Sequence, residues 1–154
     1  MTPGPGITVA AADPRDPGPA ALLAQSHALM RAMFPTDACH FLDLAALAGP
    51  DIRFVAASAD GAVLGTGALA LRDGYSEVKS MFTAPEARGR GVADAVLRHL
   101  IGLARAEGCG VLRLETGVGL DAAHRLYARH GFRPRGPFGT YRAQPESLFY
   151  ERAV

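Results

Sequence analysis

Lysine is almost missing from the sequence: Lys79 is its only copy, and arginine supplies the rest of the positive charge. Sixteen Lys and Arg against fifteen Asp and Glu leave a formal net charge of +1. Nucleic-acid-binding domains carry a clear excess of basic residues, because they must neutralise phosphates. The balance therefore argues against nucleic acid as a partner, while it leaves room for one local basic site.

Cysteine is scarce too, and long apolar runs are absent. Cys39 and Cys109 form no C-x-x-C pair, which predicts free thiols in a reducing cytosol. The five histidines show no metal-ligand spacing, so we predict no metal site. No apolar run reaches the roughly 18 residues of a membrane span, and the first residues do not resemble a signal peptide. We expect a cytoplasmic protein without a membrane contact.

The length and composition fit one globular domain. The chain has 154 residues, of which 49% are hydrophobic and 20% are charged. A domain of this size can bury roughly 68–70% of its unfolded surface, so it needs no disulfide or metal to hold a core. We predict a single domain over residues 1–154.

The apolar pattern predicts a mixed α/β sheet. Asp60-Gly61 between two apolar stretches is a hairpin signal, and the period changes from strand-like to helical at Val92. Gly108 is placed to end that helix, which makes it the crossover to the next strand. The predicted strands are Ile7–Ala11, Arg53–Ser58, Ala62–Leu71, Tyr75–Thr83, Val111–Thr116 and Leu148–Arg152, and the other predicted helices are Pro17–Phe34, Phe41–Leu47 and Ala122–His130.

The segment Arg88–Ala93 joins a predicted strand to a predicted helix and carries the clearest chemical signal. Gly89 and Gly91 let the backbone turn tightly, and the first amides of the helix have no intrahelical partner. Together with Arg88 and Arg90 they form a cradle suited to a pyrophosphate. Neither the P-loop pattern nor the dinucleotide fingerprint is present, so neither class of nucleotide-binding protein is indicated.

The same segment fits the pattern R/Q-x-x-G-x-G/A and resembles the GNAT acetyltransferases, in which that motif binds the pyrophosphate of coenzyme A. Leu114-Glu115-Thr116 resembles the fifth strand of the family. The block Ala123–Phe132 resembles its A-x-x-L-Y-x-x-x-G-F helix. In its N-terminal half, including His27 and Cys39-His40, the chain resembles a group of small bacterial acetyltransferases of the YsnE type.

The resemblance implies a fold and a set of site residues. The GNAT fold has antiparallel N-terminal strands, a central crossover helix and a V-shaped splay between its fourth and fifth strands. Acetyl-CoA is the implied cofactor, a small molecule is the implied acceptor, and a homodimer is compatible with the family. The implied contacts to coenzyme A are Met81, Phe82, Thr83, Arg88, Gly89, Arg90, Gly91, Val92 and Ala93, and the implied substrate-pocket residues are His27, His40 and Tyr141.

A mechanism follows from what acyl transfer needs. An amine with a pKa of about 10.4 must lose a proton before it attacks, and the resemblance implies Glu77 as the base, since some GNATs carry a glutamate at this place. A backbone N–H near Met81 would donate to the thioester oxygen. Tyr127 matches the family's position for the residue that protonates the leaving thiolate. The bland alternatives are a solvated carboxylate at Glu77 and a core tyrosine at Tyr127. For the whole protein, an O-acyltransferase and a non-catalytic acyl-CoA-binding module remain alternatives to an N-acetyltransferase.

Overall fold

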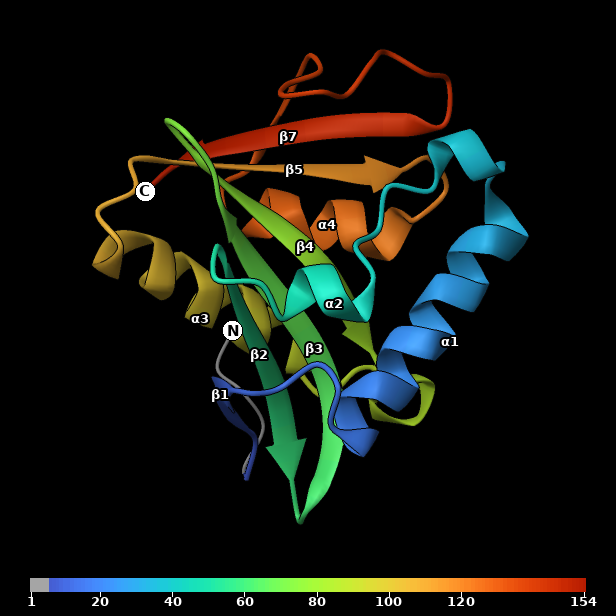
Figure 1. Ribbon diagram of the computed structural model, residues 1–154, viewed down its shortest axis with the longest axis vertical. Coiled ribbons are helices and arrows are strands. Elements are labelled where there is room, and N and C mark those ends of the chain that lie inside the picture. The colour runs from blue at the N-terminus through green and yellow to red at the C-terminus, as the bar shows by residue number, and fades with distance from the viewer. Residues whose placement is uncertain (1–5) are drawn as a thin grey trace.

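Residues 6–154 are described by a computed structural model, in which one seven-stranded mixed sheet carries helices on both faces (Figure 1). The elements in chain order are β1 (Thr8–Ala11), α1 (Pro17–Met33), the 3₁₀ turn η1 (Thr36–Ala38), α2 (Leu44–Leu47), β2 (Ile52–Ala59), β3 (Ala62–Leu71), β4 (Ser76–Thr83), the 3₁₀ turn η2 (Pro85–Ala87), α3 (Val92–Ala106), β5 (Val111–Gly117), α4 (Asp121–Arg129), β6 (Arg133–Arg135) and β7 (Ser147–Ala153). The strand order is β1-β2-β3-β4-β5-β7-β6, and of these neighbours only β4 and β5 run parallel. The predicted mixed sheet with α3 as its crossover is therefore confirmed.

The second helix differs from its prediction. We expected it over Phe41–Leu47, but α2 is one turn that begins at Leu44. The reason is the N-cap: the side chain of Asp43 accepts a hydrogen bond from the backbone N–H of Ala46 at 2.8 Å, which starts the helix there. Within residues 6–154, no helix has the length and apolar content that would let it cross a membrane.

The larger core lies between α3 and the sheet. The apolar stripe of α3 is buried, with Val96, Leu97 and Leu100 at most 1% exposed. Burying such a side chain contributes roughly 1.5–3 kcal/mol. The helix can come this close because β3 presents glycines to it: a Cβ on Gly67 would lie 2.5 Å from Cγ1 of Val96, and one on Gly65 would lie 2.6 Å from Cγ1 of Val92.

A smaller core covers the other face of the sheet. It joins α1 and α2 to β2 and β3 through Leu23, Leu47 and Phe54, each at most 5% exposed. In Figure 1, α2 lies in front of the strands while α3 and α4 lie behind them. The sheet is thus enclosed on both faces, and its gap between β4 and β5 opens between α1 and α4.

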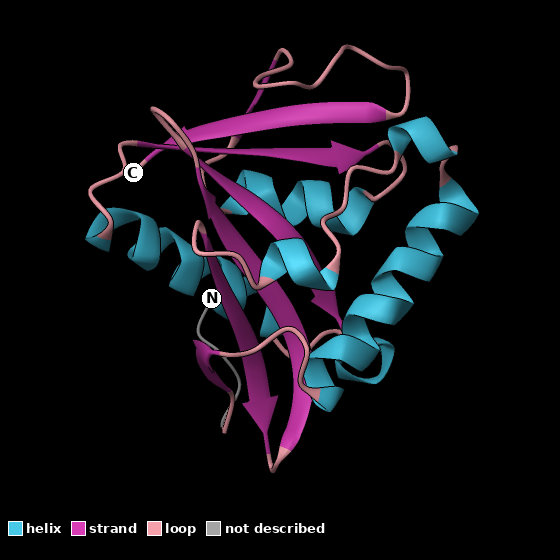
Figure 2. Ribbon diagram, in the orientation of Figure 1, coloured by secondary structure: helices cyan, strands magenta, loops and turns pink. Residues whose placement is uncertain are grey.

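That gap is the feature that positions the site. β4 and β5 pair only at Ser76 with Leu112 and at Glu77 with Arg113, and beyond these pairs they run apart (Figure 2). The pairing of β4 with β3 also shifts register beyond Lys79, where Ser80 has a φ of 57°. This confirms the predicted V-shaped splay between the fourth and fifth strands.

Candidate active site

A cavity of about 130 Å³ lies where β4 and β5 diverge, between these strands, α1 and α4. Its walls contain residues from four separate parts of the chain that we predicted to belong to the active site. They also contain polar residues that were not predicted as site residues. Glu77 and Tyr141, which were also predicted, do not line it. The residues of the cavity that matter for its chemistry are His27, His40, Ser80, Met81, Glu115 and Tyr127.

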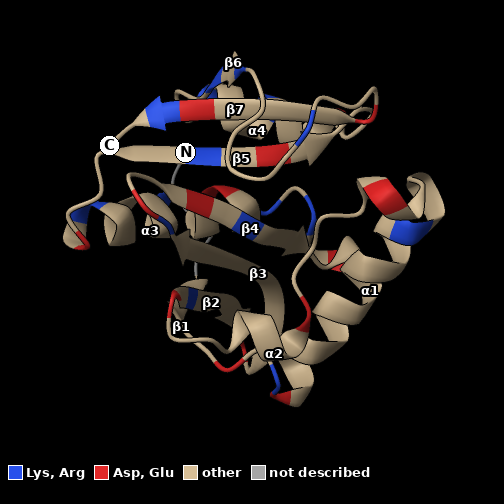
Figure 3. Cartoon of the chain, turned by 45° about the horizontal axis from the view of Figure 1, so that its top comes forward, with Lys and Arg blue, Asp and Glu red and all other residues tan. Residues whose placement is uncertain are grey.

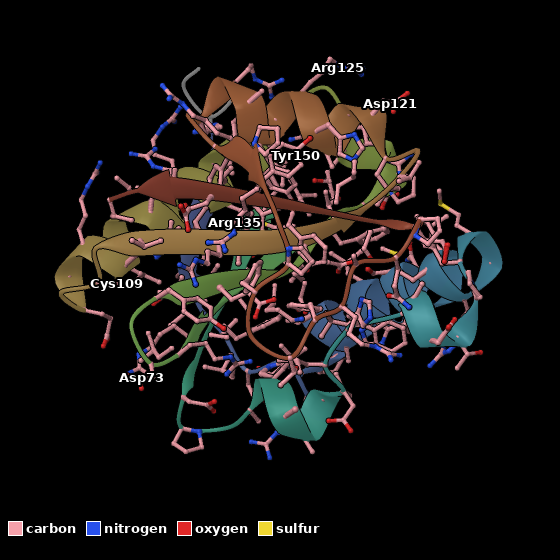
Figure 4. The ribbon with its side chains drawn as sticks, turned by 90° about the horizontal axis from the view of Figure 1, so that it is seen from above. Asp73, Cys109, Asp121, Arg125, Arg135 and Tyr150 are labelled. Carbon is pink, nitrogen blue, oxygen red and sulfur yellow. The ribbon has the colours of Figure 1, made fainter. Side chains whose placement is uncertain are left out.

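Tyr127 faces the cavity from α4. Its side chain is only 6% exposed, and its ring packs near those of Phe132 and Tyr150, with centroids 5.8 and 6.2 Å away. Figure 4 shows the opposite side of α4, where Asp121 and Arg125 point away from the sheet. Burial, and then the negative charge of Glu115, raise the pKa of the Tyr127 hydroxyl above its usual range. The hydroxyl therefore stays protonated and can donate a hydrogen bond.

Glu77 lies at the closed end of the splay and is already engaged. It is 3% exposed, and the hydroxyl of Tyr141 donates a hydrogen bond to its Oε2. Lys79 Nζ lies 3.4 Å from the same oxygen, and Arg72 Nε lies 4.0 Å from Oε1. The predicted base is thus covered by the loop that carries Tyr141, and it does not line the cavity.

Lys79 ties the surrounding segments to this carboxylate. Its Nζ donates to the backbone oxygen of His40 and to the hydroxyl of Tyr141, both at 2.8 Å. Figure 3 shows the charged residues of the two strands: an acidic residue precedes a basic one along β4, and a basic residue precedes an acidic one along β5. The contacts fix both the His40 segment and the Tyr141 loop against β4. They also explain why Tyr141 does not face the cavity.

Glu115 is the carboxylate that does face the cavity. Its side chain is 13% exposed, and His40 Nδ1 lies 3.3 Å from its Oε2, although without the alignment of a hydrogen bond. From the sequence we considered Glu115 only as part of a strand motif. Its place near the end of β5, beyond the residues that pair with β4, could have indicated that its side chain is not covered by the neighbouring strand.

Met81, Phe82 and Thr83 continue β4 from the cavity towards α3. Phe82 and Thr83 pair with β3, at Thr66 and Gly65. On the β5 side, no strand in the described chain pairs with this part of β4. The free edge is a row of backbone donors and acceptors that can bind an extended, amide-containing ligand.

The loop before α3 has the geometry of an anion cradle. Gly89 and Gly91 both have a φ of 80°, and Gly91 is the N-cap of α3. Arg88 and Arg90 are exposed, and within residues 6–154 neither forms an ion pair. The amides of Val92 and Ala93 are among the first of the helix, where an anion is favoured by about 0.3–2 kcal/mol.

The buried acid at the start of α3 is neutralised by α4. Asp94, in the first turn of α3, accepts hydrogen bonds from Arg129 Nη2 at 3.1 Å and is 2.9 Å from His130 Nε2. Burial opposes the charged form, but the contacts with His130 and Arg129 outweigh it and lower the pKa of the Asp94 carboxyl. The charge of Asp94 is therefore balanced before an anion binds to the cradle.

The site shows neither a metal-binding group nor a disulfide among the described residues. In the described part of the chain, no group of three or more His, Cys, Asp or Glu residues is placed to hold a metal ion. Cys39 and Cys109 are free thiols. Cys39 borders the cavity, and its Sγ lies 3.6 Å from the backbone oxygen of Met30.

Proteins with similar sequences are acetyltransferases by name. The IAA acetyltransferase of Azospirillum brasilense is 41% identical over 152 residues, which cover 97% of this chain and 99% of that protein. The uncharacterized N-acetyltransferase YsnE of Bacillus subtilis is 38% identical over 128 residues, covering 81% of this chain and 85% of YsnE.

Solved structures agree with these relatives. A Klebsiella pneumoniae protein assigned as an acyl-CoA N-acyltransferase has a TM-score of 0.80 and 30% identity, with coverage of 96% of this chain and 97% of that one. The PaiA N-acetyltransferase of Thermoplasma acidophilum, solved in complex with coenzyme A, shares the fold with a TM-score of 0.72 at 13% identity, covering 96% and 99% of the two chains. The acetyltransferase (GNAT) family profile matches residues 22–132. The chain is therefore a member of the acetyltransferase (GNAT) family.

Proposed function

We propose that the protein transfers an acetyl group from acetyl-CoA to the amine of a small molecule, by direct attack in a ternary complex. The observation that carries this proposal is that Glu115 and Tyr127 border one cavity where β4 loses its parallel partner. An acid and a base on the same small space are what proton transfer around an acyl transfer requires.

Three features of the chain fit acetyl-CoA. The cradle of Arg88–Ala93 suits its pyrophosphate, with glycines at positive φ and guanidinium groups that form no ion pair with residues 6–154. The free edge of β4 suits the amides of its pantetheine arm. The cavity suits the thioester end. Acetyl-CoA supplies an activated acetyl carbon, to which the amine nitrogen bonds as the carbon–sulfur bond breaks.

The chain's own residues handle the protons. We assign the base to Glu115, with His40 beside it, since the carboxylate of Glu77 is occupied by Tyr141 and Lys79. Glu115 takes one proton from the acceptor's ammonium group. Tyr127 gives its proton to the sulfur and regains one from the nitrogen, so that the products are an amide, a free thiol and one proton released from Glu115 to solvent.

The backbone N–H of Met81 is the group we assign to the thioester oxygen. Met81 borders the cavity on β4, next to Ser80 with its left-handed backbone. The Met81 N–H belongs to the same peptide group as the carbonyl of Ser80. The hydroxyl of Thr66 donates a hydrogen bond to that carbonyl oxygen at 2.8 Å, which fixes the orientation of the peptide group. A preorganised donor of this kind typically contributes about 2.7–4 kcal/mol to transition-state stabilisation.

The test combines binding with turnover. Calorimetric titration of the purified protein with acetyl-CoA should give saturable 1:1 binding, and thiol release should follow when primary amines are added. Tyr127→Phe should bind acetyl-CoA as the wild type does but lower kcat by about 10²–10⁴-fold. Binding without turnover for any amine or alcohol would support a non-catalytic acyl-CoA module, and turnover of alcohols alone would support an O-acyltransferase.

A further inference from the structure

Three buried polar atoms of the cavity have no hydrogen-bond partner within residues 6–154. They are Nε2 of His27, Nδ1 of His40 and Oγ of Ser80, and all three residues line the same cavity. Leaving such an atom buried and unpaired costs about 1–3 kcal/mol. Buried polar atoms in native proteins are usually completed by a ligand or by ordered water. Three such atoms on one cavity therefore offer hydrogen bonds to a polar ligand.

The unpaired atoms lie on different walls. His40 is next to Glu115 of β5, so that side of the cavity carries a negative charge and suits an ammonium group. His27 comes from α1, and Ser80 comes from β4. Burial, and then the nearby charge of Arg31, lower the pKa of His27, with Asp43 opposing in part. His27 is thus a neutral imidazole that can donate from Nε2, and Ser80 can donate its hydroxyl.

Ser80 is held in place for this role by its backbone. It has a φ of 57°, a conformation that non-glycine residues adopt rarely and that costs of the order of 1–3 kcal/mol. Glycine would adopt it without strain, so a side chain here is an exception to the local preference. His27 is equally constrained, since its ring stacks on Phe41 with centroids 4.0 Å apart and planes inclined by 12°.

The size of the cavity limits the acceptor further. Its 130 Å³ is similar to the roughly 150 Å³ of an enclosed cavity that binds benzene. Its remaining walls, such as Met30, Phe34 and Leu120, are mainly apolar. The cavity therefore favours a compact acceptor with an ammonium group, a hydrogen-bond-accepting group close to it and a small apolar side chain.

We infer that the acceptor is a compact α-amino acid, with its ammonium group on Glu115 and its carboxylate on His27 Nε2 and Ser80 Oγ. The inference deepens the proposed function and rests on it for the acetyl transfer, although the binding itself can be measured without turnover. Lys79 also lines the cavity, with its ammonium group 3.4 Å from the carboxylate of Glu77.

The experiment measures acceptor binding to the protein saturated with coenzyme A, which cannot react. Alanine, serine, valine and methionine are titrated by calorimetry, each beside the amine that lacks only the carboxylate: ethylamine, ethanolamine, isobutylamine and 3-(methylthio)propylamine. We expect at least one amino acid to bind tenfold or more tightly than its amine. Ser80→Gly, which also relieves the backbone strain, and His27→Phe, which keeps the stacking on Phe41, should each remove most of this difference.

Controls separate the inference from the proposed function. His99→Phe makes the same substitution outside the cavity and should leave the preference for the carboxylate unchanged. Amino acids that bind no better than their amines, or equal losses for both in the two cavity variants, would overturn the inference. Thiol release with the amines alone would then leave the proposed function standing. Amino-acid binding without any acetyl transfer would leave the inference standing and remove the proposed function.

Discussion

Two glutamates of this site show how burial alone fails to identify a base. Glu77 and Glu115 both lie near the junction of β4 and β5, and both are mostly buried. The carboxylate of Glu77 accepts from Tyr141 and Lys79, whereas that of Glu115 borders the cavity beside Tyr127. The two residues differ in their partners rather than in their burial, and we propose Glu115 as the base because of this difference.

Replacing each glutamate separately tests this assignment. Glu115→Gln should lower kcat/KM by about 10²–10⁴-fold, because it removes the proton acceptor and keeps the shape. Binding of acetyl-CoA, measured by calorimetry, should stay unchanged in the same variant, which a purely structural role would not leave intact. Glu77→Gln is the matched control and should keep most of kcat/KM while it lowers stability. A large loss of kcat/KM in Glu77→Gln and its retention in Glu115→Gln would return the base to Glu77.

The choice between these residues was out of reach of sequence reasoning. The motif around Tyr127 is local, so its position on one face of a helix could be predicted. The position of Glu77 beneath Tyr141 depends on how the Pro134–Pro145 loop folds over β4, which no local pattern encodes. In the same way, the exposure of Glu115 depends on where β4 and β5 stop pairing.

At the scale of elements, the close contact of α3 with β3 sets the depth of the core. The helix was predictable because its apolar residues recur at helical spacing. Its distance from the sheet was not, because it depends on which strand residues lack a side chain. Gly65 and Gly67 are those residues, and each would place a Cβ within 2.6 Å of a valine methyl of α3.

A pair of glycine substitutions measures this contact. Gly67→Ala should lower the free energy of unfolding by about 1–3 kcal/mol, because the new methyl would clash with Val96, Met81 and Leu100. Gly102→Ala is the control in α3 itself: nothing lies within 4 Å of its Cβ position, so it should raise stability by roughly 0.5–1 kcal/mol. Urea denaturation followed by circular dichroism gives both values, and a neutral Gly67→Ala would show that α3 can shift.

The cradle before α3 is the second element that invites a direct measurement. Arg88→Ala/Arg90→Ala should weaken acetyl-CoA binding at least tenfold, since a charge-assisted hydrogen bond contributes about 1.5–3 kcal/mol. The loss should shrink as the salt concentration rises. Arg105→Ala removes a charge from the far end of the same helix and should leave the affinity unchanged. Equal affinities for the double variant and the wild type, measured by calorimetry, would place the cofactor elsewhere.

For the molecule as a whole, a net charge of +1 means that affinity for anions must come from local geometry. That geometry lies in the loop before α3, and in the first turn of the same helix Asp94 joins α3 to the end of α4 through Arg129 and His130. This contact links the cradle to the helix that carries Tyr127. It also links the stability of the protein to pH.

The sign of the pH effect follows from the lowered pKa of Asp94. A carboxyl whose pKa is depressed in the folded state stabilises the protein above its unfolded value of about 3.9, and this contribution is lost as the pH falls through the folded value. Asp94→Asn should therefore lower the free energy of unfolding by about 1–3 kcal/mol at pH 7, and the difference from the wild type should shrink below about pH 4. A difference that stays constant down to pH 3 in urea titrations would contradict this account.

The near absence of lysine has a practical side. The side chain of Lys79 is only 9% exposed. Its ammonium group donates hydrogen bonds to the backbone oxygen of His40, the hydroxyl of Tyr141 and the carboxylate of Glu77. Amine-directed reagents, and acetyl-CoA itself in slow uncatalysed reactions, therefore find no readily reactive lysine on this protein. In labelling experiments, self-acetylation of lysine side chains should contribute little to the consumption of acetyl-CoA.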